Sequence, residues 1–312
     1  MMFFSSILLA LLVVLPLAAP PARAASDRLP LSVPDSDWRP LDQRWDRGLQ
    51  VRLETALRQN PLWQSLVIEG KMAVGLVDLN DPKAPRYARV NGNTMMYAAS
   101  LPKIAVLLAA CQGFEDGTLR ESPQIQADMV EMVRRSDNFA TNKVIQQIGL
   151  RKIGEVITDP RYRFYDQGKG GGLWLGTGFG LHVEQNLEPL KNLDHAATVH
   201  QVCRFYYLLA YGRLINPKRS RQILKTLAFP DLDDKFMKAL GKSVPLYQMY
   251  RKSGEWRTWY SDSVLVWAGP RRRYILAALI DHEQGEKILQ ELLPAMEGIL
   301  RASLPVRPGP AR

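Results

Sequence analysis

Two hydrophobic patterns alternate along the chain and predict its helices and strands. Helical spacing of apolar residues falls on the ranges 42–59, 124–135, 140–148, 196–211 and 283–300. Strand-like runs fall on 72–79 and 86–97 near the start, and on 247–252, 258–267 and 274–281 near the end. Strands thus come from both chain ends and helices mainly from the middle. We expect an α+β fold, in which one antiparallel sheet is flanked by helices and carries an inserted all-helical lobe.

The same pattern sets the expected domain boundaries. We expect a signal peptide at 1–24, a Pro- and Ser-rich leader segment at 25–40 and a loose tail at 303–312. Between them lies a single domain, 41–302. Its sheet lobe comprises 41–97 and 235–302, and its helical lobe comprises 98–234.

The N-terminus, "MMFFSSILLALLVVLPLAAPPARAAS", resembles an export signal. An apolar run is followed by Ala22-Arg23-Ala24, a small-x-small cleavage pattern that would make Ala25 the first mature residue. The segment before the run lacks Lys and Arg, so an uncleaved membrane anchor is the alternative. We expect a secreted or periplasmic protein with no stable membrane span after processing, because no later stretch is long and apolar enough to cross a bilayer.

Charge narrows the expected partners. The 312 residues carry a net charge of +10, which becomes +9 when Arg23 leaves with the signal. The basic runs at 271–273 and 218–219 are scattered and belong to no nucleic-acid motif, so we expect no nucleic-acid partner. An exported basic protein more plausibly meets anionic small molecules, cell-wall polymers or membrane surfaces.

The chain has two cysteines, Cys111 and Cys203, and both lie in apolar helical patterns. Buried free thiols are the expected state. An oxidising compartment would also permit a disulfide between them, and the sequence does not show whether they are close.

A buried helix is predicted by "AASLPKIAVLLAACQG", residues 98–113, yet Ser100 and Lys103 stand at its head. Three positions apart, their side chains would share one helical face. If Ser100 lies on the first turn, its oxygen also meets the positive end of the helix dipole. A desolvated lysine has a lowered pKa and can remove the serine proton. The alternative is an N-cap serine followed by a lysine that reaches to water.

Two further polar triplets follow in the chain. Ser136-Asp137-Asn138 lies between two predicted helices, where such residues commonly serve as caps. Lys252-Ser253-Gly254 lies on a predicted strand, where a polar edge with a glycine bulge is the structural alternative. Each triplet alone is better explained by structure than by catalysis.

The ordered set S-x-x-K, S-D-N and K-[ST]-G is the signature of the serine β-lactamase and penicillin-binding-protein superfamily. Over about 42–300 the sequence resembles the class A β-lactamase branch, with K-S-G in place of K-T-G. The resemblance implies a β-lactamase/DD-peptidase-like fold with no cofactor and no metal.

The resemblance also implies a role for each motif residue. Ser100 would be the acylated nucleophile, Lys103 its base or proton relay, and Ser136 the donor to the departing nitrogen. The other implied roles are substrate-amide binding by Asn138, substrate-carboxylate binding by Lys252 and Ser253 of the Lys252-Ser253-Gly254 triplet, and an oxyanion hole formed by the backbone N–H groups of Ser100 and Glu255. Lys252 would also help to keep Lys103 neutral.

The sequence departs from class A in two places. Ser100 and Ser136 are 36 positions apart, which is shorter than usual and implies a trimmed helical lobe. Class A enzymes also have a glutamate, in an E-x-x-L-N pattern after S-D-N, that activates the deacylating water. Between Asn138 and Leu181 the only glutamate is Glu155, in a predicted helix, and the matching loop reads "YDQGKGGGLWLGTG". Asp166 is a weak candidate for the missing base, and turn formation is its alternative role.

Other candidate residues add little. His182, His195 and His200 lack a recognisable zinc spacing, so we assign no metal. Trp256 and Trp259 follow K-S-G and would either wall the site or pack on the sheet, and packing is favoured.

Together these features predict an exported serine hydrolase that forms an acyl-enzyme on Ser100 with β-lactams or related D-alanyl amides. A penicillin-binding peptidase or a β-lactam-trapping protein is the alternative on the same fold. A non-catalytic binding protein is the alternative of another class.

Overall fold

The computed structural model describes residues 28–180 and 184–302. The predicted signal peptide, the C-terminal tail and His182 lie outside these residues. Within the described ranges, no helix combines the length and the apolar character that a bilayer crossing requires.

A five-stranded antiparallel sheet forms the centre of the molecule, in the order β2-β1-β10-β9-β8. The N-terminal part supplies β1 (Met72–Asp78) and β2 (Arg86–Val90), and the C-terminal part supplies β8 (Met249–Trp256), β9 (Trp259–Trp267) and β10 (Arg273–Asp281). The pairing of β1 with β10 joins the two chain ends, with Met72 opposite Ile280 and Asp78 opposite Tyr274. The predicted α+β class, with a sheet built from both ends, is confirmed.

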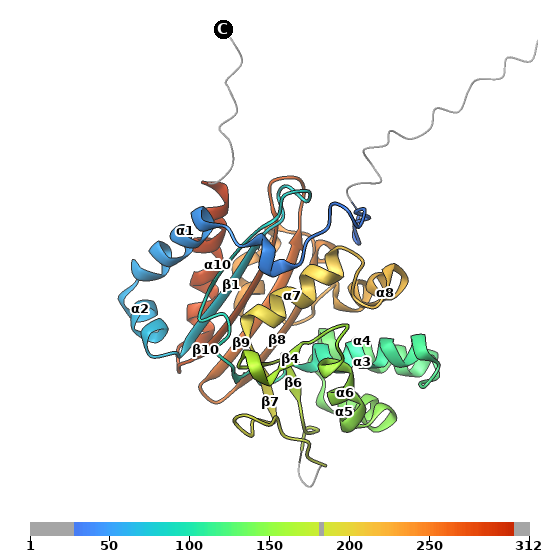
Figure 1. Ribbon diagram of the computed structural model, residues 1–312. Helices are drawn as coiled ribbons and strands as arrows, with labels where there is room; N and C mark the ends of the chain where they lie inside the picture. Colours follow the sequence, from blue (N-terminus) through green and yellow to red (C-terminus); the bar gives the residue numbers. More distant parts are fainter. Residues whose placement is uncertain (1–27, 181–183, 303–312) are drawn as a thin grey trace, which may run out of the picture.

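Helices cover both faces of this sheet (Figure 1). One face packs against α1 (Arg47–Arg58), α2 (Pro61–Ile68), α9 (Lys235–Leu240) and α10 (Gly285–Arg301). The other face packs against α7 (Val199–Ala210). Alternate residues of β1 enter the two cores, because successive strand side chains point to opposite faces. The sheet is therefore buried on both sides.

The helical lobe continues the second core away from the sheet. It contains α3 (Lys103–Asp116), α4 (Pro123–Arg134), α5 (Asn138–Ile148), α6 (Leu150–Thr158) and α8 (Pro217–Leu227). The central helix α3 is buried all round from Lys103 to Phe114, as its uninterrupted apolar sequence predicts. Within the range expected for this lobe, α7 packs against β10, β1 and β9 of the large sheet.

Short elements connect these layers. The strands β3 (Met96–Tyr97), β7 (His195–Ala197) and β6 (Trp174–Leu175) form a small sheet beside the head of α3, and β4 (Tyr165–Asp166) pairs with β5 (Gly171–Gly172). The 3-10 turns are η2 (Leu41–Arg44), η3 (Gln167–Lys169), η4 (Gly241–Ser243) and η5 (Leu246–Gln248). Much of the glycine-rich stretch that appeared as a loop in the sequence is thus paired backbone.

Local capping explains where the boundaries differ from the sequence patterns. Asp46 caps α1 by accepting a hydrogen bond from the Leu49 N–H, so the helix predicted from residue 42 begins at Arg47. Asn60 and Pro61 start α2, which the sequence analysis missed. The single strand predicted at 86–97 is two strands, because Asn91 adopts a positive φ of 51° between them.

The two cysteines are free and buried, Cys111 on α3 and Cys203 on α7. The favoured expectation of free thiols is confirmed, and the disulfide is not formed.

Candidate active site

Ser100 lies in the turn that leads into α3, and not on the first turn of the helix. The helix begins at Lys103, and Ala99 turns the chain with a positive φ of 48°. Within residues 28–180 and 184–302, neither the Ser100 hydroxyl nor its backbone N–H has a hydrogen-bond partner. The half-buried Ser100 thus has a hydroxyl that is available to react and a backbone N–H that is available to bind a negatively charged oxygen.

Backbone contacts hold this turn from two sides. The N–H of Ala98 donates to the carbonyl of His195 (2.8 Å), and the Ala98 carbonyl accepts from the Ser261 hydroxyl (2.8 Å). The small sheet and the large sheet therefore both fix the chain two residues before the nucleophile.

Gly254 brings strand β8 directly against the nucleophile turn. A Cβ atom at this position would lie 2.5 Å from the Ser100 nitrogen, 2.6 Å from the Ala98 oxygen and 2.7 Å from the Leu101 nitrogen. All three are backbone atoms that cannot move aside independently. The glycine of the third motif is therefore required by close packing, and β8 pairs with β9 without a bulge.

We expect Gly254→Ala to displace the turn, lower the free energy of unfolding by about 1–3 kcal/mol and slow acylation by about 10²-fold. Denaturant unfolding and the rate of covalent labelling measure the two effects. Gly298→Ala on α10 is the control, because no atom lies within 4 Å of its added Cβ. Labelling of Gly254→Ala at the rate of this control would contradict the assignment.

Lys103 is fully buried beneath the cleft. Its Nζ donates to the Ser136 carbonyl (2.7 Å) and to the Asn138 Oδ1 (2.8 Å), and the Phe179 ring centroid lies 4.2 Å away. Burial lowers the pKa of Lys103 to about 7, while the nearby Asp137 carboxylate acts in the opposite direction. A substantial fraction of the Lys103 side chains is therefore uncharged at neutral pH.

The hydroxyl of Ser136 links the two lysines of the motifs. It accepts a hydrogen bond from the Lys252 Nζ at 2.9 Å and lies 3.5 Å from the Lys103 Nζ. Ser136 adopts a positive φ of 57°, which lets it approach both lysines before α5 begins at Asn138. The Ser136 hydroxyl thus lies between the amines of Lys103 and Lys252.

Lys252 is buried on β8, and its pKa is lowered well below the ordinary value by burial and then by the neighbouring Lys103 and Arg251 charges. The sequence analysis expected Lys252 to keep Lys103 neutral. The structure shows burial as the main cause of the lowered Lys103 pKa.

Strand β8 is the edge of the large sheet and lies against the Ser100 turn at Gly254. Trp256 faces Trp259 across a two-residue turn, and Glu255 is opposite Tyr260. Because hydrogen-bonded and non-hydrogen-bonded pairs alternate, we expect the Glu255 N–H to point away from β9, toward the open edge. Together with the free Ser100 N–H, it would form a two-donor oxyanion hole.

An open cleft of about 810 Å³ exposes Ser100. Besides Ser100, Asn138 and Glu255, its lining comprises Tyr97, Ala99, Thr177, Gly178, Phe179, Gly180, Gln185, Asp194, His195 and Trp256. The sequence did not predict most of this wall, although the aromatic residue within "GTGFG" was a possible signal.

Trp256 lines the cleft and is exposed, so the packing role favoured for it is wrong, whereas Trp259 packs edge-to-face on Tyr97.

The predicted stand-in base does not reach this cleft. Asp166 ends strand β4, and its carboxylate accepts a hydrogen bond from the Gly168 N–H at 3.0 Å. It is absent from the cleft lining, so its geometry matches the turn-forming alternative.

A buried glutamate lies just beyond the segment that the sequence analysis searched. The Glu188 carboxylate accepts hydrogen bonds from the Tyr165 hydroxyl (2.7 Å) and from the backbone N–H groups of Leu190, Lys191 and Leu193. It does not line the cleft. Glu188 therefore organises its own loop and does not face Ser100.

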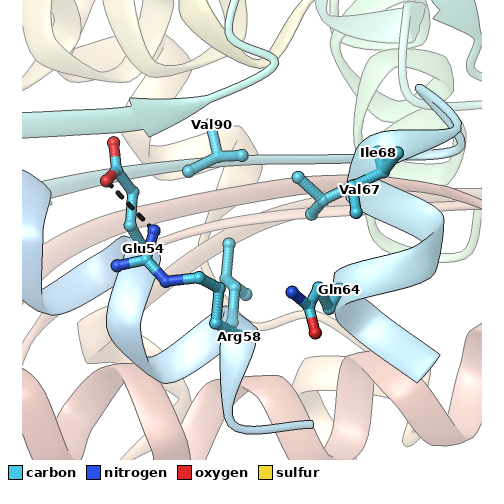
Figure 2. A pocket seen from close by; sticks show the side chains of 7 residues that line it. Glu54, Arg58, Gln64, Val67, Ile68 and Val90 are labelled. Atoms are coloured by element: carbon cyan, nitrogen blue, oxygen red, sulfur yellow. Dashed lines mark ion pairs between the residues drawn. The ribbon is translucent and has the colours of Figure 1, made fainter. Parts of the chain in front are cut away.

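A second hollow, between α1 and α2, is shown in Figure 2. Its walls are largely apolar, and its one ion pair joins Glu54 to Arg58 at 3.5 Å. The seven lining residues include no serine, cysteine, histidine or lysine, and the one carboxylate among them, Glu54, is paired with Arg58.

Solved structures share this fold at low sequence identity. A β-lactamase from Sphaerobacter thermophilus is 16% identical with a TM-score of 0.58, over 84% of this chain and 98% of that one. A class A β-lactamase from Bacteroides cellulosilyticus is 15% identical with a TM-score of 0.58, over 83% and 100%. A PBP-A variant in an acyl-enzyme complex with penicillin G is 17% identical with a TM-score of 0.56, over 85% and 98%.

No curated protein matches the sequence significantly. The model of the beta-lactamase enzyme family matches residues 64–131 and 124–303, which is most of the chain. The resemblance inferred from the motifs is confirmed: the chain belongs to the beta-lactamase enzyme family of serine hydrolases.

Proposed function

We propose that the protein forms an acyl-enzyme on Ser100 with β-lactams or related D-alanyl amides and releases the acyl group slowly. Two observations carry this proposal: the hydroxyl and N–H of Ser100 are free among the described residues, and Lys103, three positions further along the chain, is buried with a pKa of about 7. A nucleophile, a base and an oxyanion donor thus meet at one cleft.

The acylation step follows from these contacts. The Ser100 Oγ bonds to the substrate carbonyl carbon while neutral Lys103 takes the hydroxyl proton. Negative charge on the carbonyl oxygen is stabilised by the Ser100 N–H and, we expect, the Glu255 N–H. As the C–N bond breaks, the proton moves from Lys103 through Ser136 to the departing nitrogen. Two N–H groups of the neutral Lys103 amine donate to the Ser136 carbonyl and the Asn138 side chain. The lone pair of the nitrogen is therefore left to accept the serine proton.

A substrate carboxylate would bind at Ser253 and toward Lys252, on the edge strand beside Ser100. Both residues are buried on β8. A substrate carboxylate would favour the charged form of Lys252, which burial otherwise disfavours, and would meet it in a water-poor environment, where the attraction is stronger. The penicillin G complex of the PBP-A variant supports the choice of substrate class, because that protein shares the fold and forms an acyl-enzyme.

Deacylation requires a base that activates water beside the ester. Among the described residues, no carboxylate forms an ion pair with Lys103. The two carboxylates of the cleft have other contacts: Asp194 accepts from the His195 N–H, and Glu255 pairs with Lys235 at 2.5 Å. We propose that neither carboxylate serves as the deacylating base, and hydrolysis is then slower by about 10²–10⁴-fold, the usual contribution of a general base.

We therefore expect a penicillin to leave an adduct that long outlasts its formation, with slow turnover. Turnover of a chromogenic cephalosporin and the lifetime of the penicillin adduct, measured together, test this. A slow steady rate with a persistent adduct supports the proposal. Stoichiometric labelling without turnover would identify the β-lactam-trapping alternative, and neither labelling nor turnover would favour the non-catalytic one. Return to free enzyme as fast as acylation would contradict slow release.

Export would place this activity beside the D-alanyl peptides of the cell wall, and we propose it from the small-x-small pattern that ends at Ala24. N-terminal sequencing of the mature protein tests it. A first residue at Ala25 supports export with cleavage, whereas an intact Met1 would contradict cleavage.

A further inference from the structure

One aromatic side chain stands directly over the catalytic lysine. Phe179 lines the cleft together with Ser100, and the centroid of its ring lies 4.2 Å from the Lys103 Nζ. The other contacts of this ammonium are the Ser136 carbonyl and hydroxyl and the Asn138 side chain. The ring therefore closes a side of Lys103 that would otherwise face the cleft.

The position of Phe179 is fixed by a pair of hydrogen bonds. The Asn142 side chain on α5 donates its Nδ2 to the Phe179 carbonyl (2.7 Å) and accepts the Phe179 N–H on its Oδ1 (2.8 Å). A side-chain amide that satisfies both backbone groups of one residue holds that residue as a β-ladder would. Asn142 lies one helical turn after Asn138, so the same helix positions the Lys103 partner and the Phe179 backbone.

The Phe179 ring also packs against a histidine. The His195 imidazole stacks on Phe179, with centroids 4.6 Å apart and an interplanar angle of 26°. The His195 Nε2 lies 3.1 Å from the Thr177 carbonyl, which requires a proton on Nε2 and ties the imidazole to the same loop. Phe179 thus contacts both a fixed histidine and Lys103, and its contact with the lysine is not that of a loose loop tip.

A phenyl ring at this place has opposite effects on the two half-reactions. Its π-face stabilises the ammonium that forms when Lys103 takes the Ser100 proton, a contact generally worth about 0.5–2 kcal/mol. The same ring has no acceptor for a water proton and excludes water from the volume it fills. It assists acylation and obstructs hydrolysis of the ester.

We propose that Phe179, clamped by Asn142 and backed by His195, is a positioning residue that keeps bulk water from Lys103 and from the ester on Ser100. The proposal rests on the acyl-enzyme function proposed above and adds the side chain that sets its lifetime.

Two measurements on Phe179→Ala test this shield. In the free protein, NMR of isotope-labelled lysine side chains follows the Lys103 titration. We expect its pKa to rise from about 7 toward its ordinary value of 10.5, because burial is the main cause of the lowered pKa and regained hydration of the ammonium outweighs the lost π contact. After penicillin treatment, mass spectrometry follows the adduct, whose lifetime should fall by at least about tenfold.

Matched variants separate shielding from a general loss of structure. Phe179→Leu keeps an apolar side chain over Lys103 but removes the π-face, so the adduct should last about as long as in wild type and the Lys103 pKa should stay at or slightly below its wild-type value. Phe139→Ala is the control for loss of an aromatic residue, since Phe139 lies on α5, is 70% exposed and packs on Lys143. Asn142→Ala releases the clamp and should shift both measurements in the direction of Phe179→Ala.

An unchanged Lys103 pKa in Phe179→Ala, or an adduct as long-lived as in Phe139→Ala, would overturn the proposal. If the wild-type protein forms no adduct, the proposed acyl-enzyme function fails. In that event the titration in the free protein still decides whether Phe179 shields Lys103.

Discussion

Ser100→Ala is expected to abolish covalent labelling by a penicillin and all turnover, with the fold unchanged. The Ser100 hydroxyl has no hydrogen-bond partner among the described residues, so its removal leaves no buried polar group unpaired. We expect the free energy of unfolding to change by no more than about 0.5 kcal/mol. Intact-mass measurement and denaturant unfolding give the two values.

Ser65→Ala is the matched control, because Ser65 lies on α2, away from the cleft, and bonds only to Glu69 in an exposed pair. It should label as the wild type does. A covalent adduct on Ser100→Ala would show that another residue is the nucleophile.

The second large effect is expected for Lys103→Met, which replaces a buried amine by an apolar side chain of similar length. Acylation should slow by about 10²–10⁴-fold, because the serine proton loses its acceptor. The fold should persist with no loss of stability. Lys103 has a pKa of about 10 in an unfolded chain and of about 7 in the folded one, so below pH 7 the folded protein carries an unfavourable buried charge. Lys103→Met removes this charge, and the free energy of unfolding should therefore not fall.

The pH dependence of the acylation rate shows whether Lys103 acts as a neutral base. Because the neutral amine accepts the proton, wild-type acylation should rise as pH increases through about 7 and then level off. Lys103→Met should lose this rise together with the rate. A wild-type acylation rate that falls as pH increases from 6 to 8 would contradict a neutral Lys103 base, as would a Lys103→Met variant of normal rate.

The sequence predicted the fold well because its signals are local and repeated. Apolar runs at both ends specify the strands, and the uninterrupted apolar stretch after Lys103 specifies a buried helix. Helix starts were less accurate where a single cap decides them, as Asp46 does for α1.

The candidate site could be predicted only in part from the sequence. The three motifs are recognisable because their residue order is distinctive, and the structure brings Lys103, Ser136 and Lys252 into contact. The opposing cleft wall is different, because Phe179 and His195 acquire their positions from contacts with distant residues such as Asn142 and Ala98. No spacing rule links these positions. The tight approach of Gly254 to the Ser100 backbone likewise appears only in three dimensions.

The most direct test of the central claim is peptide mapping by mass spectrometry after exposure of the wild-type protein to a penicillin. The account predicts a single acyl adduct, located on Ser100 and still present well after free penicillin has been removed. An adduct on any other residue, or complete absence of an adduct in a folded protein under conditions that label a penicillin-binding protein, would contradict it.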